Sequence, residues 1–133
     1  MKWKDCPGWG SKTLVMGILN ATPDSFSGDG LISAHDTVER ALATARAQCE
    51  AGADILDVGG ESTRPGADTV DAATEKARIL PLIEEIRSAF PGILISADTY
   101  RADVAEAARL CVAVVIPLKS RVVFRTPVMR ELE

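Results

Sequence analysis

The chain has 133 residues, of which 47% are hydrophobic and 26% are charged, a composition typical of one globular domain with a real core. The formal net charge of −4 argues against a nucleic-acid surface, so no nucleic-acid partner is expected. The three cysteines form no C-x-x-C pair, and no apolar run is long enough to span a membrane. Unpaired cysteines favour a reducing compartment, and we expect a cytoplasmic protein without a membrane partner.

Short runs rich in Ile, Leu and Val predict strands at residues 14–19, 54–58 and 93–97, and a fourth apolar run occupies 112–116. Each of the three strands is followed by a loop and then by a longer stretch with helical spacing. Strands of nearly continuous apolar character that alternate with helices indicate a parallel sheet buried on both faces. An open doubly wound sheet and part of a (β/α)₈ barrel both fit this pattern.

Each predicted helix has one apolar face. The face of the first helix consists of Val38, Leu42, Ala45 and Cys49. The face of the second consists of Ile79, Leu82, Ile83, Ile86 and Phe90. Ser33 and Asp36 would form a capping box at the first helix, and Pro81 should kink the second or mark its first turns. A third helix is predicted from Arg101 to about Leu110.

Ligand-type side chains follow all three predicted strands. The segments are "NATPDSFSGDG" from residue 20, "GGESTRPGA" from residue 59 and "SADTYR" from residue 96. Each alone could be an ordinary turn or a helix cap. Both candidate architectures place their sites at the carboxyl ends of the strands. We therefore expect Asn20 and Asp98 at the same end of the sheet.

The motifs "MGILNATPDSFSGDG", "AGADILDVGGESTRPGA" and "ISADTYRADVAEAA" resemble the N-terminal half of the pterin-binding dihydropteroate synthase family. The resemblance covers about residues 14–108 and implies a partial (β/α)₈ TIM barrel of about three to four βα units. It further implies a single domain over residues 1–133, a truncated pterin-binding barrel. Residues of about 110–133 form a divergent C-terminal tail, because the family's next strand, which ends in "ND", has no match there.

The resemblance also implies a transferase of folate biosynthesis. That family condenses dihydropterin pyrophosphate with p-aminobenzoate to give dihydropteroate and pyrophosphate, assisted by Mg²⁺, and sulfonamides compete for the aminobenzoate site. Asn20 matches the family residue that meets Mg²⁺ and pyrophosphate, and an amide oxygen is a suitable Mg²⁺ ligand. Thr22, Asp24 and Phe26 match the catalytic first loop, where Phe26 packs on the aminobenzoate ring.

The second and third loops supply the remaining implied site residues. Thr63, Arg64 and Pro65 match the family's second, substrate-binding loop. Arg64 also counts among the catalytic residues, because its fixed fork of donors suits an oxyanion. Asp98 matches the pterin-binding aspartate, and its carboxylate would accept two N–H bonds from the amino-pyrimidine edge. Asp29 stands in "SFSGDG", where the commoner family order is "SFSDGG".

The C-terminal departure from the family leaves three interpretations open. The chain could be a fragment of a full synthase, a half-barrel that dimerises, or a non-catalytic half-barrel that binds a pterin or a partner. Half a barrel exposes sheet edges and inner strand faces, which predicts a homo-oligomer. We also expect no turnover by the chain alone, because the family's further pterin contacts have no match in the sequence.

Overall fold

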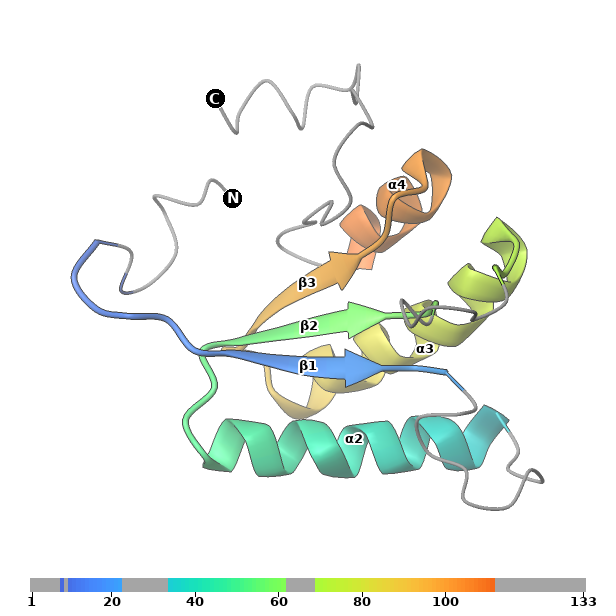
Figure 1. Cartoon of the computed structure of the whole chain (residues 1–133). Coiled ribbons are helices and arrows are strands. Elements are labelled where there is room, and N and C mark those ends of the chain that lie inside the picture. The colour runs from blue at the N-terminus through green and yellow to red at the C-terminus, as the bar shows by residue number, and fades with distance from the viewer. Residues whose placement is uncertain (1–7, 9, 23–33, 62–68, 112–133) are drawn as a thin grey trace.

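The computed structural model describes residues 8, 10–22, 34–61 and 69–111. Strands and helices alternate along this part of the chain, as Figure 1 shows. The elements, labelled as in Figure 1, are β1 (Met16–Asn20), α2 (Ala34–Glu50), β2 (Ile55–Gly59), α3 (Ala72–Ala89), β3 (Leu94–Asp98) and α4 (Ala102–Cys111). The apolar run at 112–116 and the tail that follows it lie outside the described residues.

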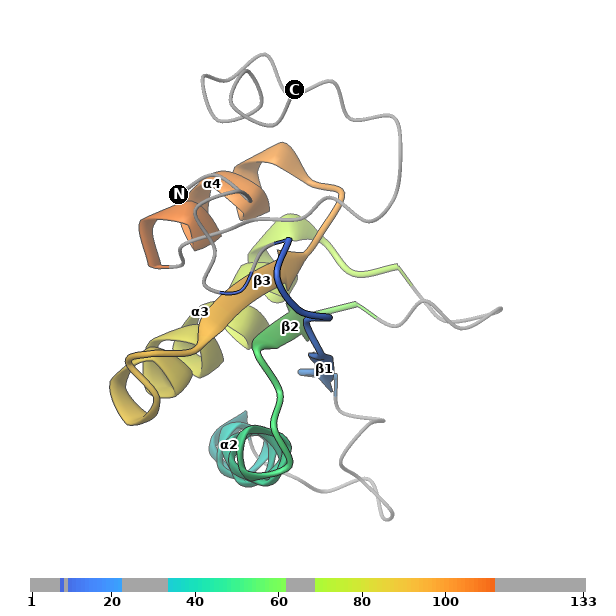
Figure 2. The same cartoon turned by 90° about the vertical axis from the view of Figure 1, so that its left-hand side faces the viewer.

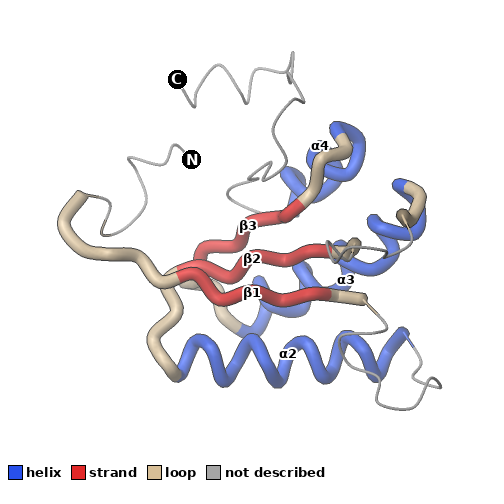
Figure 3. Tube along the Cα trace, in the orientation of Figure 1, coloured by secondary structure: helices blue, strands red, loops and turns tan. Residues whose placement is uncertain are grey.

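The strands form one parallel sheet in the order β1-β2-β3, drawn side by side in Figure 3. This arrangement confirms the predicted α/β class and supplies three βα units of a partial barrel. Each strand lies one or two residues further along the chain than its apolar run suggested. Asn20, Gly59 and Asp98 are consequently the last residues of their strands.

The helices lie to one side of the sheet (Figure 2). The core between them consists mainly of aliphatic side chains from both layers: Leu19, Leu56, Val58, Ile95 and Ala97 from the strands, and Ala41, Ala45, Ile79, Leu82, Ile83, Ile86, Val104 and Ala108 from the helices. The apolar faces expected for the helices are confirmed, because all their members belong to this cluster or pack against it. Within the described ranges, no helix has the length and apolarity that a membrane span requires.

Helix α3 begins earlier than its apolar pattern suggested. Its N-cap is Asp71, whose side chain accepts a hydrogen bond from the Thr74 backbone N–H at 2.7 Å. This bond satisfies one of the free N–H groups of the first turn. Pro81 therefore lies in the interior of the helix and does not mark its first turns. The residue is exposed, so its ring points away from the core. Ser33, expected to cap α2, lies outside the described residues.

A glycine ends α2 and directs the chain into β2. Gly52 has a φ of +97°, in the left-handed region that glycine enters without steric cost. The Gly52 N–H donates to Cys49 O and the Ala53 N–H to Gln48 O, both at 3.0 Å. These two bonds form a Schellman motif, which satisfies carbonyl groups at the end of the helix.

Candidate functional site at the carboxyl ends of the strands

Asn20, Gly59 and Asp98 are register partners across the three strands. They form one row at the carboxyl ends of the sheet, with Gly59 in the middle. The prediction that Asn20 and Asp98 lie at the same end of the sheet is confirmed. The loops that carry the other candidate residues all leave from this row or from the residues just after it.

Gly59 leaves a space between the two polar side chains. A β-carbon at position 59 would lie 3.4 Å from Asn20 Oδ1, 3.7 Å from Asp98 Cβ and 3.8 Å from Asp98 Oδ2. An amide oxygen and a carboxylate oxygen therefore border the same small region above the middle strand. Asn20 is exposed and Asp98 is half-buried, so a ligand could reach both.

Side chains two residues apart on a strand point to the same face of the sheet, so each strand contributes three residues to the face that carries the last row. This face becomes more polar toward the carboxyl ends of the strands. The row at the amino ends consists of Met16, Ile55 and Leu94. The middle row consists of Ile18, Asp57 and Ser96. Polar groups thus increase from the apolar first row through the mixed second row to the row of Asn20, Gly59 and Asp98.

Asp57 is a buried residue of the middle row, two residues before Gly59 on β2. Ser96 Oγ donates a hydrogen bond to Asp57 Oδ1 from the neighbouring strand. Burial raises the pKa of Asp57 above its ordinary value, and the bond from Ser96 opposes that rise in part. Asp57 was not among the predicted site residues. A charged residue inside the apolar run "DILDV" was the available signal.

The remaining predicted residues divide into described and undescribed positions. The Ala21 N–H donates to Gly59 O at 2.7 Å, which continues the β1–β2 pairing and places Thr22 just past the last row. Thr22 is buried. Five predicted site residues lie outside the described residues: Asp24, Phe26, Thr63, Arg64 and Pro65.

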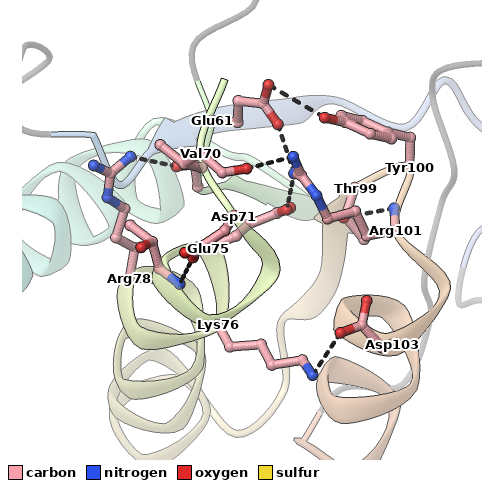
Figure 4. Close-up of polar contacts among 12 residues, drawn as sticks. Glu61, Val70, Asp71, Glu75, Lys76, Arg78, Thr99, Tyr100, Arg101 and Asp103 are labelled. Carbon is pink, nitrogen blue, oxygen red and sulfur yellow. Dashed lines mark hydrogen bonds and ion pairs between the residues drawn. The ribbon is translucent and has the colours of Figure 1, made fainter. Parts of the chain in front are cut away.

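A group of charged side chains next to Asp98 was missed from the sequence. Arg101 forms ion pairs with Glu61, which follows β2, and with Glu75 in the first turn of α3 (Figure 4). Tyr100 OH donates to Glu61 Oε1 at 3.4 Å. Burial would lower the pKa of Arg101, but its hydrogen bonds to both glutamates raise that pKa above its ordinary value. For Tyr100, burial and the nearby Glu61 both raise the pKa.

The donor atoms of the last row suit a hard cation. Mg²⁺ prefers oxygen ligands and keeps several of its waters, so it needs few protein ligands. Asn20 Oδ1 is such an oxygen, and the Asn20 side chain is exposed at the end of β1. Within residues 8–22, 34–61 and 69–111, less residue 9, no group of three or more His, Cys, Asp or Glu side chains could hold a metal. A Mg²⁺ ion held at Asn20 would therefore keep most of its waters.

The fold and this row define a class: an α/β protein of parallel βα units whose polar site lies at the carboxyl ends of the strands. The family model described as pterin binding enzyme matches residues 16–116. The chain belongs to the pterin binding enzyme family. It is 52% identical over 97 residues to a dihydropteroate synthase of Bacillus subtilis (strain 168), a match that covers 73% of this chain and 33% of the relative.

Solved structures show the same likeness. A dihydropteroate synthase from Clostridium difficile, solved in the presence of pteroic acid, matches with a TM-score of 0.71 and 47% identity over 80% of this chain and 39% of that one. Another from Xanthomonas albilineans, with 4-aminobenzoic acid, matches with a TM-score of 0.67 and 44% identity over 75% and 35%. The chain thus spans about a third of the length of these proteins.

Proposed function

We propose that this chain takes part in dihydropteroate synthesis, the condensation of dihydropterin pyrophosphate with p-aminobenzoate. The observation that carries the proposal is the row at the carboxyl ends, where Asn20 Oδ1 and Asp98 Oδ2 border one space above Gly59. Membership of the pterin binding enzyme family supports it. So do relatives and solved neighbours that are dihydropteroate synthases.

The reaction needs little acid–base chemistry from the protein. The arylamine nitrogen forms a bond to the pterin methylene carbon while the bond from that carbon to pyrophosphate oxygen breaks. The electron pair leaves with pyrophosphate, and the amine nitrogen loses a proton. In this proposal Asp98 accepts two N–H bonds from the amino-pyrimidine edge and so fixes the orientation of the pterin ring.

The anionic leaving group would lie on the Asn20 side of the row. A Mg²⁺ ion held by Asn20 would supply positive charge for the pyrophosphate. Arg64, with Thr63 and Pro65 beside it, would add donors for the same oxyanion. Thr22, Asp24 and Phe26 would close over the aminobenzoate. Apart from Asn20 and Thr22, these residues lie outside the described ranges, and their roles rest on the resemblance alone.

Ligand binding gives the direct test. We would titrate the chain with 6-hydroxymethylpterin monophosphate in the presence of Mg²⁺ and compare Asp98→Asn with Asp103→Asn as a matched control. Asp103 lies five residues further on, in the first turn of α4, and pairs with Lys76 instead of facing the row. We expect Asp98→Asn to weaken binding about ten- to a hundred-fold, the effect of losing hydrogen bonds to a charged group. An unaffected affinity in Asp98→Asn, or no binding by the wild-type chain, would contradict the proposal.

Turnover and assembly stay predictions. A coupled assay for pyrophosphate release, with both substrates and Mg²⁺, separates the two candidate functions. Pterin binding without release of pyrophosphate favours the non-catalytic pterin-binding module.

Self-association of the chain is supported by Ile18, which is 63% exposed on the sheet face that carries the site. If a second copy covers that face, Ile18→Ser should shift the sedimentation coefficient at micromolar concentration toward that of the monomer.

A further inference from the structure

One guanidinium group connects three segments of the chain beside the site. Arg101 Nη1 donates to Glu61 Oε2 at 2.7 Å and to Glu75 Oε2 at 2.6 Å, and its Nη2 donates to the backbone carbonyl of Val70. Figure 4 shows the guanidinium between these three acceptors. Glu61 follows β2, Val70 precedes α3, and Glu75 lies in the first turn of α3.

Arg101 itself belongs to the segment that follows β3, three residues after Asp98. Its backbone N–H donates to Thr99 Oγ1 at 3.2 Å, which fixes the turn between Asp98 and α4. The guanidinium carbon also lies 4.4 Å from the centre of the Tyr100 ring, within cation–π range. The Arg101 contacts therefore run from the end of β3 to the end of β2, the two strands that carry Asp98 and Gly59.

The burial of this cluster sets it apart from a surface ion pair. The side chains of Arg101, Glu61 and Glu75 are 18%, 10% and 1% exposed, respectively. Buried ion pairs are costly to break, because the remaining partner is left as an uncompensated charge. An arginine suits this position because its planar fork offers several donors in fixed directions, whereas a lysine ammonium acts as a point charge on a flexible stem.

We propose that Arg101 is a positioning residue that fixes the carboxyl end of β2 against that of β3, and so sets the place of Asp98 relative to Gly59 and Asn20. The inference rests on the proposed function, because it assigns a task in ligand binding to a residue that does not itself lie in the row. Arg101 acts through Glu61 on one side and through its own backbone on the other. Arg101 and Glu61 would thus support the residues of the row without touching the ligand themselves.

A neighbouring ion pair allows the positional role to be separated from helix packing. Lys76 and Asp103 also join α3 to α4, with Nζ and Oδ2 2.9 Å apart. Both belong to the helices and neither belongs to a segment that ends a strand. Loss of this pair should loosen the same two helices and leave the ends of β2 and β3 in place. Lys76→Gln is therefore the matched control for Arg101→Lys.

The experiment measures the affinity of wild type, Arg101→Lys, Glu61→Gln, the double variant and Lys76→Gln for 6-hydroxymethylpterin monophosphate with Mg²⁺. All titrations are made well below the unfolding temperature of each variant, so a purely structural loss leaves the dissociation constant unchanged. We expect Arg101→Lys to weaken binding roughly ten-fold, with a clearly non-additive effect in the double variant, because the two residues act through one contact. Lys76→Gln should stay within about two-fold of wild type.

Hydrogen–deuterium exchange provides the readout that does not depend on a ligand. In Arg101→Lys, the backbone amides of residues 59–61 and 98–101 should exchange faster than in wild type, while those of α2 are unchanged. If wild type binds the pterin and Arg101→Lys binds equally well, the positioning role is wrong although the proposed function stands. If wild type binds nothing, the proposed function fails, and unchanged exchange at both strand ends then overturns the positioning role as well.

Discussion

Ser96 donates a hydrogen bond to Asp57 across β2 and β3, one row below Asp98. Both side chains are buried. The pair thus places a carboxyl group in a poorly solvated position directly beneath the candidate site. Because burial disfavours the charged form, the folded protein holds the proton of Asp57 more tightly than the unfolded chain does.

This proton affinity predicts a pH dependence of stability. A carboxyl whose pKa is raised in the folded state contributes stability below its unfolded value, here 3.8, and loses that contribution as the pH rises through the folded pKa. The free energy of unfolding of wild type, relative to Asp57→Asn, should therefore fall as the pH rises above about 4. Urea titrations of both proteins across that range measure it, and parallel pH profiles would contradict it.

Ser96→Ala sharpens the same prediction. The Ser96 hydroxyl lowers the pKa of Asp57 against the effect of burial, so its loss should raise that pKa further. The pH interval over which stability falls should then extend further upward than in wild type, while its lower limit stays at the unfolded pKa. An unchanged upper limit in Ser96→Ala would show that the hydroxyl does not bond the ionised carboxylate in solution.

Two adjacent glycines at the end of β2 should respond differently to alanine. At Gly59 the new methyl group would meet no atom closer than 3.4 Å and would occupy the space between Asn20 and Asp98. At Gly60 it would lie 2.8 Å from Ile79 Cγ2 and 3.2 Å from Glu75 O. Gly59→Ala should thus lower pterin affinity with little change in stability. Gly60→Ala should lower the free energy of unfolding by about 1–3 kcal/mol, the usual cost of overpacking.

Denaturant titration and ligand titration of both variants separate the two effects. A Gly59→Ala protein that unfolds as readily as Gly60→Ala would mean that the space above Gly59 is already filled by other groups. A Gly60→Ala protein of wild-type stability would mean that α3 moves away from β2 at little cost.

A second pair of glycines tests backbone conformation alone. Gly52 precedes β2 with a φ of +97°, and Gly92 precedes β3 without a positive φ, yet a β-carbon would meet no atom within 4 Å at either position. Gly52→Ala should therefore cost about 1–2 kcal/mol of stability from left-handed strain. Gly92→Ala should leave stability unchanged or raise it by up to about 1 kcal/mol. Equal effects of the two substitutions on the urea midpoint would refute this assignment.

Periodicity in the sequence predicted the strands, the helix faces and the convergence of Asn20 with Asp98. These features depend on local patterns and on the rule that parallel strands place their carboxyl ends together. Of the two roles predicted for Pro81, a place in the first turns is wrong, because the N-cap that starts α3, Asp71, lies eight residues before the first member of the apolar face. A helix can begin well before its buried positions do.

The Arg101 cluster could not be predicted in this way. Arg101 lies 26 residues from Glu75 and 40 residues from Glu61 in the sequence, and no local pattern joins such positions.

The spacing of the strands, in contrast, could have predicted which residues pair across the sheet. Paired residues of β1 and β2 are separated by the same 39 residues as those of β2 and β3, as the Asp57–Ser96 pair illustrates. Asn20, Gly59 and Asp98 follow one another at this same interval, so the sequence alone could have matched them as one row.

The equal spacing of the strands has a kinetic consequence. Closing a loop costs entropy that grows with its length, so pairing β1 with β2 and pairing β2 with β3 carry the same entropic cost. The order of pairing is then decided by apolar burial. Strand β1 has one buried apolar residue, Leu19, whereas β2 and β3 have three each: Ile55, Leu56 and Val58, and Leu94, Ile95 and Ala97. Strand β1 should dock last during folding and open first in the native state. Each such opening would carry Asn20 away while Gly59 and Asp98 stay paired, so amides of β1 should exchange with solvent well before those of β3.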